Sequence, residues 1–270
     1  MPRAPGTYKA GGFTVAGAGA YAKEAVLAGR RRLDVELVAR GLAATRSQAR
    51  AAIEAGGVRV DGAILRRPAQ IVSTEAAIDF QPAHDWASRG GVKLAHALDV
   101  FGVDPAGLDC LDVGASTGGF TDVLLSRGAR RVWAVDVGRS QIIDRLRADR
   151  RVTVMEATDA RTLDAVMLGG RPELVVCDVS FISLAKALPA ALALGAEDAV
   201  LVALFKPQFE VGPDHVGRGG LVRDAAAADR SATEVEGWLA GVGWRVEGWT
   251  PSPILGGDGN AERLLLARRS

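Results

Sequence analysis

A glycine-rich turn directly after a buried apolar run is the feature that most restricts how this chain can fold. Residues 107–114 read GLDCLDVG, a pattern typical of a buried strand, and residues 115–120 read ASTGGF, where a helix pattern opens. Glycines at such a place permit a tight turn and let a ligand approach the backbone closely. The arrangement predicts the first strand and helix of a sheet that holds a nucleoside cofactor.

Strand and helix patterns then alternate to the end of the chain. The seven predicted strands read GLDCLDVG, RVWAVDVG, RVTVMEA, ELVVCDVS, DAVLVALFK, WRVEGWTPSPI and ERLLLARR. Helix patterns between them act as crossovers, which predicts an α/β fold with a mostly parallel, doubly wound sheet. The last two runs are joined by the turn-rich SPILGGDGNA, so we expect them to pair antiparallel with each other at one edge of the sheet, with the last strand antiparallel to the rest.

A smaller basic segment, residues 30–80, precedes this sheet. One helix pattern starts at Leu33, and a second is capped by Thr45 and stops at Gly56. The dipeptide DG at residues 61–62 is a hairpin signal between short alternating runs. The segment therefore predicts a small α+β domain of two helices and a small sheet.

Three further stretches complete the predicted domain organisation. Residues 81–89 have turn composition and predict a linker, and residues 90–270 hold the large domain. Residues 1–29 are rich in Ala and Gly without a clean period, which predicts a poorly ordered extension.

Charge is distributed unevenly, although the formal net charge is only +1. Residues 1–80 carry 12 Lys and Arg against 7 Asp and Glu, and the remainder carries 21 against 25, an asymmetry expected where one part meets a polyanion. No run of 18 apolar residues occurs, so we expect a cytoplasmic protein without a membrane segment. Cys110 and Cys177 lie in apolar runs and are expected to pack in the core.

Acidic residues near the turn indicate which cofactor is bound. Asp136 ends the second strand, where a carboxylate can accept hydrogen bonds from ribose hydroxyls. A dinucleotide fingerprint needs glycine where Ser116 stands, and Asp112 could hold an amino group, so the pattern favours S-adenosylmethionine. A glycine turn used only for packing is the plain alternative. The predicted cofactor-binding residues are Asp112, Gly114, Ala115, Ser116, Thr117, Gly118, Gly119, Phe120, Asp136, Val137, Asp159 and Asp178.

Four polar residues, Lys93, Asp178, Lys206 and Glu262, lie where a doubly wound sheet delivers side chains to one pocket. Singly, each could be a strand-end or solvent-facing side chain. Together they supply what attack of a sugar hydroxyl on a sulfonium methyl needs, since the hydroxyl must be oriented and must lose its proton. We predict Lys206 as base or orienting residue and Asp178 as its partner. Lys93 and Glu262 form the predicted supporting pair.

Arginines of the front segment are predicted to meet nucleic acid. Some fall on the start of the second helix and others flank it on turns, which favours phosphates and RNA shape over base edges. A solvated basic surface is the plain alternative. About five or six phosphate contacts would weaken binding by roughly 10²- to 10³-fold between ~50 and ~200 mM salt. The predicted RNA-binding residues are Arg32, Arg40, Arg46, Ser47, Gln48, Arg50, Arg59, Arg66, Arg67 and Arg89.

These residues resemble a known family, the hemolysin-A-type ribosomal RNA 2′-O-methyltransferases, relatives of the FtsJ heat-shock methyltransferases. The matching stretches span about residues 31–268 and read RLDVELVARGLAATRSQAR, SRGGVKL, LDVGASTGGFTDVLL, AVDVG, CDVSFISL, LFKPQFEVG, GRGGLVRD and SPILGGDGN, followed by Glu262. The resemblance implies a Rossmann-like domain that uses S-adenosylmethionine, a Lys-Asp-Lys-Glu tetrad, and an alpha-L RNA-binding domain in front. It also implies cytidine 2′-hydroxyls of 16S and 23S ribosomal RNA as targets. The family tends to have Asn where Asp159 stands.

Three other functions stay open. A membrane-active cytolysin would need an amphipathic or apolar membrane segment, which the sequence lacks. A non-catalytic RNA-binding assembly factor could keep the cofactor fold. A base methyltransferase would need an Asn-Pro-Pro-aromatic motif or a Pro-Cys nucleophile, but Cys177 follows Val176. We expect a monomer, with ribosomal RNA or ribosomal subunits as partners and no metal.

Overall fold

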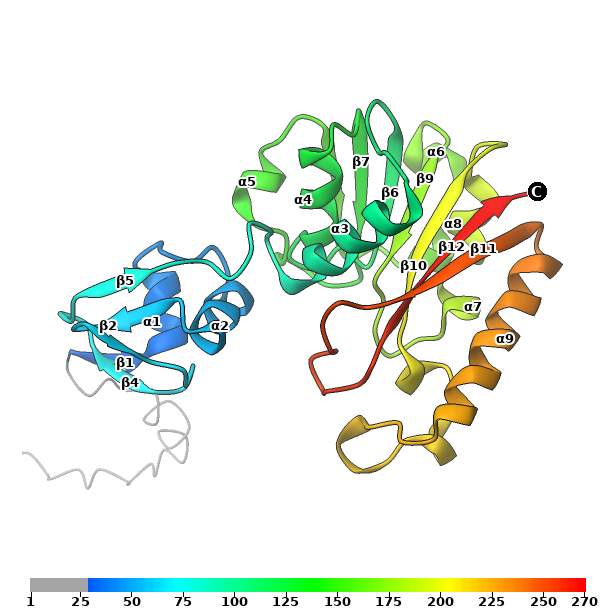
Figure 1. The fold of residues 1–270 in the computed structure, drawn as a ribbon. Coiled ribbons are helices and arrows are strands. Elements are labelled where there is room, and N and C mark those ends of the chain that lie inside the picture. The colour runs from blue at the N-terminus through cyan, green and yellow to red at the C-terminus, as the bar shows by residue number, and fades with distance from the viewer. Residues whose placement is uncertain (1–28) are drawn as a thin grey trace, which may run out of the picture.

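The computed structural model describes residues 29–270, which form a small unit and a larger unit joined by a short segment (Figure 1). Nearly all of the predicted extension, residues 1–29, lies outside the described residues. Among residues 29–270, no helix has the length and apolar character needed to cross a membrane.

The small unit packs two helices over short strands. Leu33, Leu37 and Ile53 have no exposed surface and form its core. Strand β1 pairs with β4, and β2 pairs with both β3 and β5. In chain order the elements are β1 (Arg30–Arg32), α1 (Leu33–Ala39), α2 (Arg46–Ala55), β2 (Val58–Val60), β3 (Ala63–Ile64), β4 (Ile71–Ser73) and β5 (Ile78–Phe80).

Local sequence explains where α2 begins and ends. The Thr45 hydroxyl accepts a hydrogen bond from the Gln48 backbone N–H at 3.1 Å, and Gly56 is left-handed with φ +83°. The predicted cap and stop are confirmed. The alternating run at Val58 and Val60 is confirmed as strand β2, with both valines buried. Arg59 lies between them in this strand, so its placement on a turn beside α2 is wrong.

The large unit is built on one seven-stranded sheet of order β11-β12-β10-β9-β6-β7-β8. All pairs from β10 to β8 are parallel, and β12 lies antiparallel between β10 and β11. The predicted fold class is confirmed, and so is the antiparallel pair that the last two strands form at one edge of the sheet. The strands are β6 (Asp109–Val113), β7 (Arg131–Val135), β8 (Val152–Met155), β9 (Leu174–Cys177), β10 (Val200–Phe205), β11 (Trp244–Pro251) and β12 (Arg263–Arg269).

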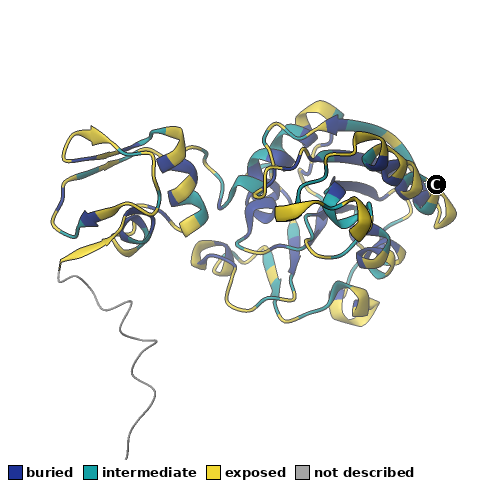
Figure 2. Ribbon diagram, turned by 90° about the horizontal axis from the view of Figure 1, so that it is seen from below, coloured by how far each residue is buried: buried dark blue, intermediate teal, exposed yellow. Residues whose placement is uncertain are grey.

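Helices cover both faces of this sheet, which is why its central strands are continuous apolar runs. Cys110 faces a layer that includes Leu94 and Val123, whereas the adjacent Leu111 faces one that includes Leu188 and Leu239. In Figure 2 the dark blue of buried residues is concentrated in the interior of the large unit, and the yellow of exposed residues lies mostly on its outer helices and loops. The helices are α3 (Arg89–Phe101), α4 (Gly119–Ser126), α5 (Asp144–Arg147), α6 (Ala165–Leu168), α7 (Leu184–Ala187), α8 (Pro189–Leu194) and α9 (Ala225–Gly241), with 3₁₀ turns η2 (Ala160–Thr162), η3 (Pro207–Phe209), η4 (Pro213–His215) and η5 (Arg218–Gly220).

Both cysteines pack as predicted. Cys110 and Cys177 have no exposed surface, and burial raises the pKa of the Cys110 thiol to about 12 and that of Cys177 further. Both side chains therefore act as small apolar groups in the core.

The joining segment contacts both units. The Thr45 hydroxyl donates to the Ala87 carbonyl at 3.3 Å, and the Ala87 N–H donates to Asp122 of α4 at 2.8 Å. Helix α3 begins at Arg89, the last residue of the predicted linker. The small unit is thereby held next to the turn between β6 and α4.

Candidate active site

The turn between β6 and α4 requires glycine for two reasons. Gly114 and Gly118 have φ values of +88° and +97°, which favour glycine. A Cβ atom on Gly114 would also lie 2.5 Å from the Asp178 carbonyl oxygen. The turn can therefore lie directly against the end of β9, and both meet at the carboxyl edge of the sheet.

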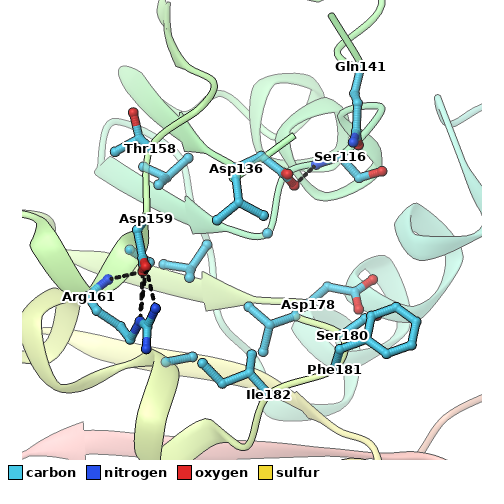
Figure 3. A pocket seen from close by; sticks show the side chains of 17 residues that line it. Ser116, Asp136, Gln141, Thr158, Asp159, Arg161, Asp178, Ser180, Phe181 and Ile182 are labelled. Carbon is cyan, nitrogen blue, oxygen red and sulfur yellow. Dashed lines mark hydrogen bonds and ion pairs between the residues drawn. The ribbon is translucent and has the colours of Figure 1, made fainter. Parts of the chain in front are cut away.

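A cavity of about 360 Å³ opens at this edge (Figure 3). Of the predicted cofactor residues, Gly114, Ser116, Asp136, Val137, Asp159 and Asp178 line it. A second cavity of about 400 Å³ is lined by Ala115, Thr117, Gly119 and Phe120, together with Lys93, Lys206 and others. The turn thus forms a wall of both cavities, here named the cofactor cavity and the tetrad cavity.

Asp136 and Asp159 are both engaged in local hydrogen bonds. Asp136 accepts from the Ser116 N–H at 2.8 Å and from the Gly138 N–H at 2.7 Å, which fixes its carboxylate at the rim (Figure 3). Asp159 accepts from the side chain and N–H of Arg161, and these bonds lower its pKa to about 2. Asp159 therefore stays ionised and tied to Arg161 in the wall of the cofactor cavity.

Asp112 lies beneath the turn rather than in a cavity. It has no exposed surface, and its Oδ2 accepts a hydrogen bond from the Thr121 hydroxyl at 2.7 Å. Its Oδ1 has no hydrogen-bond partner among residues 29–270. Burial, opposed by the Thr121 hydrogen bond, raises the pKa of Asp112 to about 7. Neither Asp112 nor Gly118 lines the cavities of the described chain, so direct cofactor contact by them stays a prediction.

The four predicted catalytic residues come together as two ion pairs. Lys206 directly follows β10, and Asp178 directly follows β9. The distance between Lys206 Nζ and Asp178 Oδ1 is 2.6 Å. Lys93 on α3 forms a salt bridge with Glu262, which immediately precedes β12. Lys93 and Glu262 are only 7% and 5% exposed, so the solvent-facing alternative for Lys93 is wrong. A buried charge is retained only when it is paired, and these pairs meet that condition.

Three members of the two pairs face one space. Lys93, Asp178 and Lys206 line the tetrad cavity, and Glu262 holds Lys93 from behind. Asp178 also lines the cofactor cavity, so the two spaces meet at its carboxylate. The arrangement can present a substrate hydroxyl to a group bound in the cofactor cavity.

Sequence reasoning missed two residues beside Asp178. Ser180 accepts a hydrogen bond from Lys206 Nζ at 2.9 Å. Phe181 is 92% exposed, has φ +65°, and lies 5.2 Å from Phe209 between ring centroids. Their position in the sequence could have indicated them, because both follow a buried strand that leads directly into the predicted site residue Asp178. Gln141, Thr158, Arg161 and Ile182 also line the cofactor cavity and were not predicted.

The predicted RNA-binding residues divide into two groups. Arg46, Ser47, Arg50 and Arg89 line a hollow of about 410 Å³ next to the tetrad cavity, and Ser47 and Arg89 line both. Others hold the fold of the small unit. Arg40 donates to Glu36 and to the Thr74 and Ala76 carbonyls, Arg32 pairs with Asp34, Arg66 donates to the Glu54 carbonyl, and Gln48 accepts from the Ala44 N–H. Arg59 donates weakly to the Gly62 carbonyl, and Arg67 is exposed.

Metal ligands are not grouped in this region. Across residues 29–270, His, Cys, Asp and Glu side chains do not form any cluster of three that could hold a metal ion.

Comparison with known proteins gives matches over both units. The FtsJ-like methyltransferase profile matches residues 86–269, and the S4 domain profile matches residues 31–78. The 16S/23S rRNA (cytidine-2′-O)-methyltransferase TlyA of Mycobacterium tuberculosis is 48% identical over 90% of this chain and 91% of the relative. Hemolysin A of Brachyspira hyodysenteriae is 36% identical over 86% and 98%. A solved structure from Streptococcus thermophilus that carries the hemolysin name is 38% identical, with a TM-score of 0.73 over 89% of each chain.

Proposed function

The chain belongs to the FtsJ-like methyltransferase family, and from this premise we propose that it methylates ribose 2′-hydroxyls of ribosomal RNA. S-adenosyl-L-methionine, the cofactor predicted from the sequence, is the methyl donor. Cytidine is the proposed target nucleoside, because the relative from M. tuberculosis carries that activity in its name and is similar over both units. The observation that carries the proposal is the shared wall between the cofactor cavity and the tetrad cavity.

The cofactor cavity fits an adenosine group. Val137 and Phe181 are 72% and 92% exposed and line the cavity, so an adenosine bound there would cover their apolar surface. Asp136 stands at the carboxyl end of β7, where ribose hydroxyls can donate to its oxygens. The bound cofactor supplies an electrophilic methyl group on a sulfonium sulfur.

The two lysines have different tasks in the proposed reaction. Lys206 contacts the 2′-hydroxyl and takes its proton as the new carbon–oxygen bond forms, while the electron pair of the breaking carbon–sulfur bond stays on sulfur. Asp178 holds Lys206 at the boundary of the two cavities. Lys93, fixed by Glu262, supplies a positive charge that stabilises the developing negative charge on oxygen.

The small unit supplies a route for RNA toward this site. Ser47 and Arg89 line both the tetrad cavity and the neighbouring hollow, whose other residues include Arg46 and Arg50. Guanidinium groups in that hollow suit phosphate oxygens of a strand that leads to the target ribose. Exposed Arg67 would add a contact farther out. Asp112 and Asp159 stay proposed cofactor contacts, Asp159 from the wall of the cofactor cavity and Asp112 from beneath the turn.

The test is transfer of tritium from labelled S-adenosyl-L-methionine to 16S RNA, 23S RNA and intact subunits. We expect label at a 2′-hydroxyl, located by ribose-sensitive primer extension, and a loss of at least about 10²-fold in rate for Lys206→Ala. Lys186→Ala is the matched control, because Lys186 is an exposed lysine of α7 outside the cavity linings.

Two outcomes would contradict the proposal. Label on a base would indicate a different methyltransferase reaction, and full activity of Lys206→Ala would remove Lys206 from the chemistry. Bound cofactor with no label on any substrate would favour the non-catalytic assembly factor. We also propose a cytoplasmic monomer, since ribosomal RNA is a cytoplasmic substrate in bacteria and the route described uses one chain; light scattering tests the monomer.

A further inference from the structure

Ser180 occupies the boundary between the cofactor and substrate spaces. Only Gly114, Ser116, Asp178 and Ser180 line both cavities in the described chain. The methyl group must cross this boundary, so its residues lie closest to the reacting atoms. Of the four, Asp178 and Ser180 are the ones that contact Lys206.

Lys206 is held at two points that differ in chemistry. Its Nζ lies 2.6 Å from the Asp178 carboxylate and 2.9 Å from the Ser180 hydroxyl oxygen. Lysine carries a compact ammonium group at the end of a flexible four-carbon chain, so a single contact would leave Nζ free to move. The ion pair with Asp178 and the hydrogen bond to Ser180 together restrict where Nζ can lie. Since Lys206 lines the tetrad cavity, a group bound there can be a further partner.

The neutral charge of the serine matters for the proposed reaction. A lysine that accepts a proton must present a lone pair, and a neutral amine has only two N–H groups. The Ser180 hydroxyl takes one N–H of Lys206, and the ion pair with Asp178 keeps Nζ at the wall of the tetrad cavity, where it can face a bound hydroxyl. A second carboxylate in place of Ser180 would hold the positive form more strongly, whereas a hydroxyl fixes position without added charge.

The segment that carries Ser180 is itself fixed at both ends. The Asp178 N–H donates to the Val113 carbonyl at 3.0 Å, and the Leu184 N–H donates to Glu210 at 2.9 Å. Between them Phe181 has a left-handed φ of +65°, a conformation that costs energy in a residue other than glycine. The local fold therefore holds this short segment in one conformation beside Lys206.

We propose that Ser180 is a positioning residue that aims Lys206 at the ribose 2′-hydroxyl. This inference rests on the proposed function and adds a residue to it. Ser180 acts through Lys206, so its removal lowers the turnover number and leaves the binding of both substrates nearly unchanged. Threonine at this position keeps the hydroxyl and keeps most of the function.

The test compares Ser180→Ala, Ser180→Thr and Ser183→Ala in methyl transfer to the RNA substrate. Ser183 is the matched control, because it lies in the same segment and makes no capping hydrogen bond for α7. We expect kcat of Ser180→Ala to fall by roughly 10- to 100-fold, as for a slightly misplaced catalytic group. The dissociation constant of S-adenosyl-L-methionine and the KM for RNA stay within about twofold, and Ser180→Thr recovers kcat to within about threefold.

Two results would overturn the inference while leaving the proposed function intact. Wild-type kcat in Ser180→Ala, with Lys206→Ala inactive, would show that Asp178 alone positions the lysine. A weaker affinity for S-adenosyl-L-methionine at unchanged kcat would make Ser180 a cofactor contact instead. Activity retained in Lys206→Ala would instead contradict the proposed function. Melting temperatures of all variants close to that of the wild type show that the variants fold.

Discussion

Two buried aspartates, one in each unit, show how differently the two regions treat a buried carboxyl group. Asp34 in α1 and Asp112 in β6 both have no exposed surface. Burial raises the pKa of Asp34, but hydrogen bonds from Arg32 and Arg46 outweigh this effect and leave its pKa below the ordinary value. Asp112 has only the Thr121 hydroxyl, and burial raises its pKa to about 7.

The difference lies in access to cations. Arg32 and Arg46 keep 45% and 58% of their side chains exposed, so they reach Asp34 from the surface without being buried themselves. Asp112 lies under the cofactor turn in the middle of the sheet, near the carboxylates of Asp178 and Asp136, which also raise its pKa. In the small unit, Asp34 therefore fixes two arginines in place. In the large unit, Asp112 has no cation partner and its pKa rises to about 7, whereas Asp122 and Glu262 are paired with cations as Asp34 is.

The largest expected effect is the pH dependence that Asp112 causes. A carboxyl whose pKa is raised from 3.8 to about 7 on folding lowers stability as pH rises between these values, and the effect is constant above them. Between pH 5 and 8 the loss is on the order of 3 kcal/mol by linkage. The side chain of Asp112→Asn cannot ionise. The difference in free energy of unfolding between this variant and wild type, measured in urea, should therefore shift by about the same amount in favour of the variant as pH rises from 5 to 8. A difference between the two proteins that stays constant with pH would refute the prediction.

A smaller effect is expected for the paired aspartate. Asp34→Asn removes charge-assisted hydrogen bonds to Arg32 and Arg46, which should cost about 2 kcal/mol at pH 7. Because the folded pKa is lowered, the native Asp34 contributes stability above 3.8 and loses it as pH falls through the folded pKa. Hydrogen exchange of the α1 amides at pH 7 measures the change. Protection equal to wild type would mean that the two arginines do not stabilise the small unit.

The smallest effect is expected for an exposed pair with a similarly lowered pKa. Hydrogen bonds from Arg151 lower the pKa of Asp149 to about 2, but the Asp149 side chain is 27% exposed and the Arg151 side chain 43% exposed. Solvent screens such a pair, so Asp149→Asn should change stability by less than about 1 kcal/mol at pH 7. A loss in thermal unfolding as large as that of Asp34→Asn would show that burial is not what separates the two regions.

Much of the architecture could be predicted from local patterns. The alternation of apolar runs and helix patterns predicted the α/β fold, and the turn glycines predicted the place of the cofactor cavity. Thr45 and Gly56 predicted the ends of α2 for stereochemical reasons that do not depend on the rest of the chain. The position of β12 between β10 and β11 could not be read in this way, because sheet order depends on how helices pack across the faces.

By itself, the sequence determined the elements and the sheet edge at which the site residues meet, since backbone propensity and the direction of parallel strands act locally. The pairing of Lys93 with Glu262 was predicted, but only the tertiary structure decided that this pair is buried. Lys93 and Glu262 are 169 residues apart, and α3 and the start of β12 bring them together in the interior. Ser180 became a partner of Lys206 in the same way, through the adjacency of β9 and β10. Burial and pairing depend on which surfaces come into contact, so they emerge only when the layers pack.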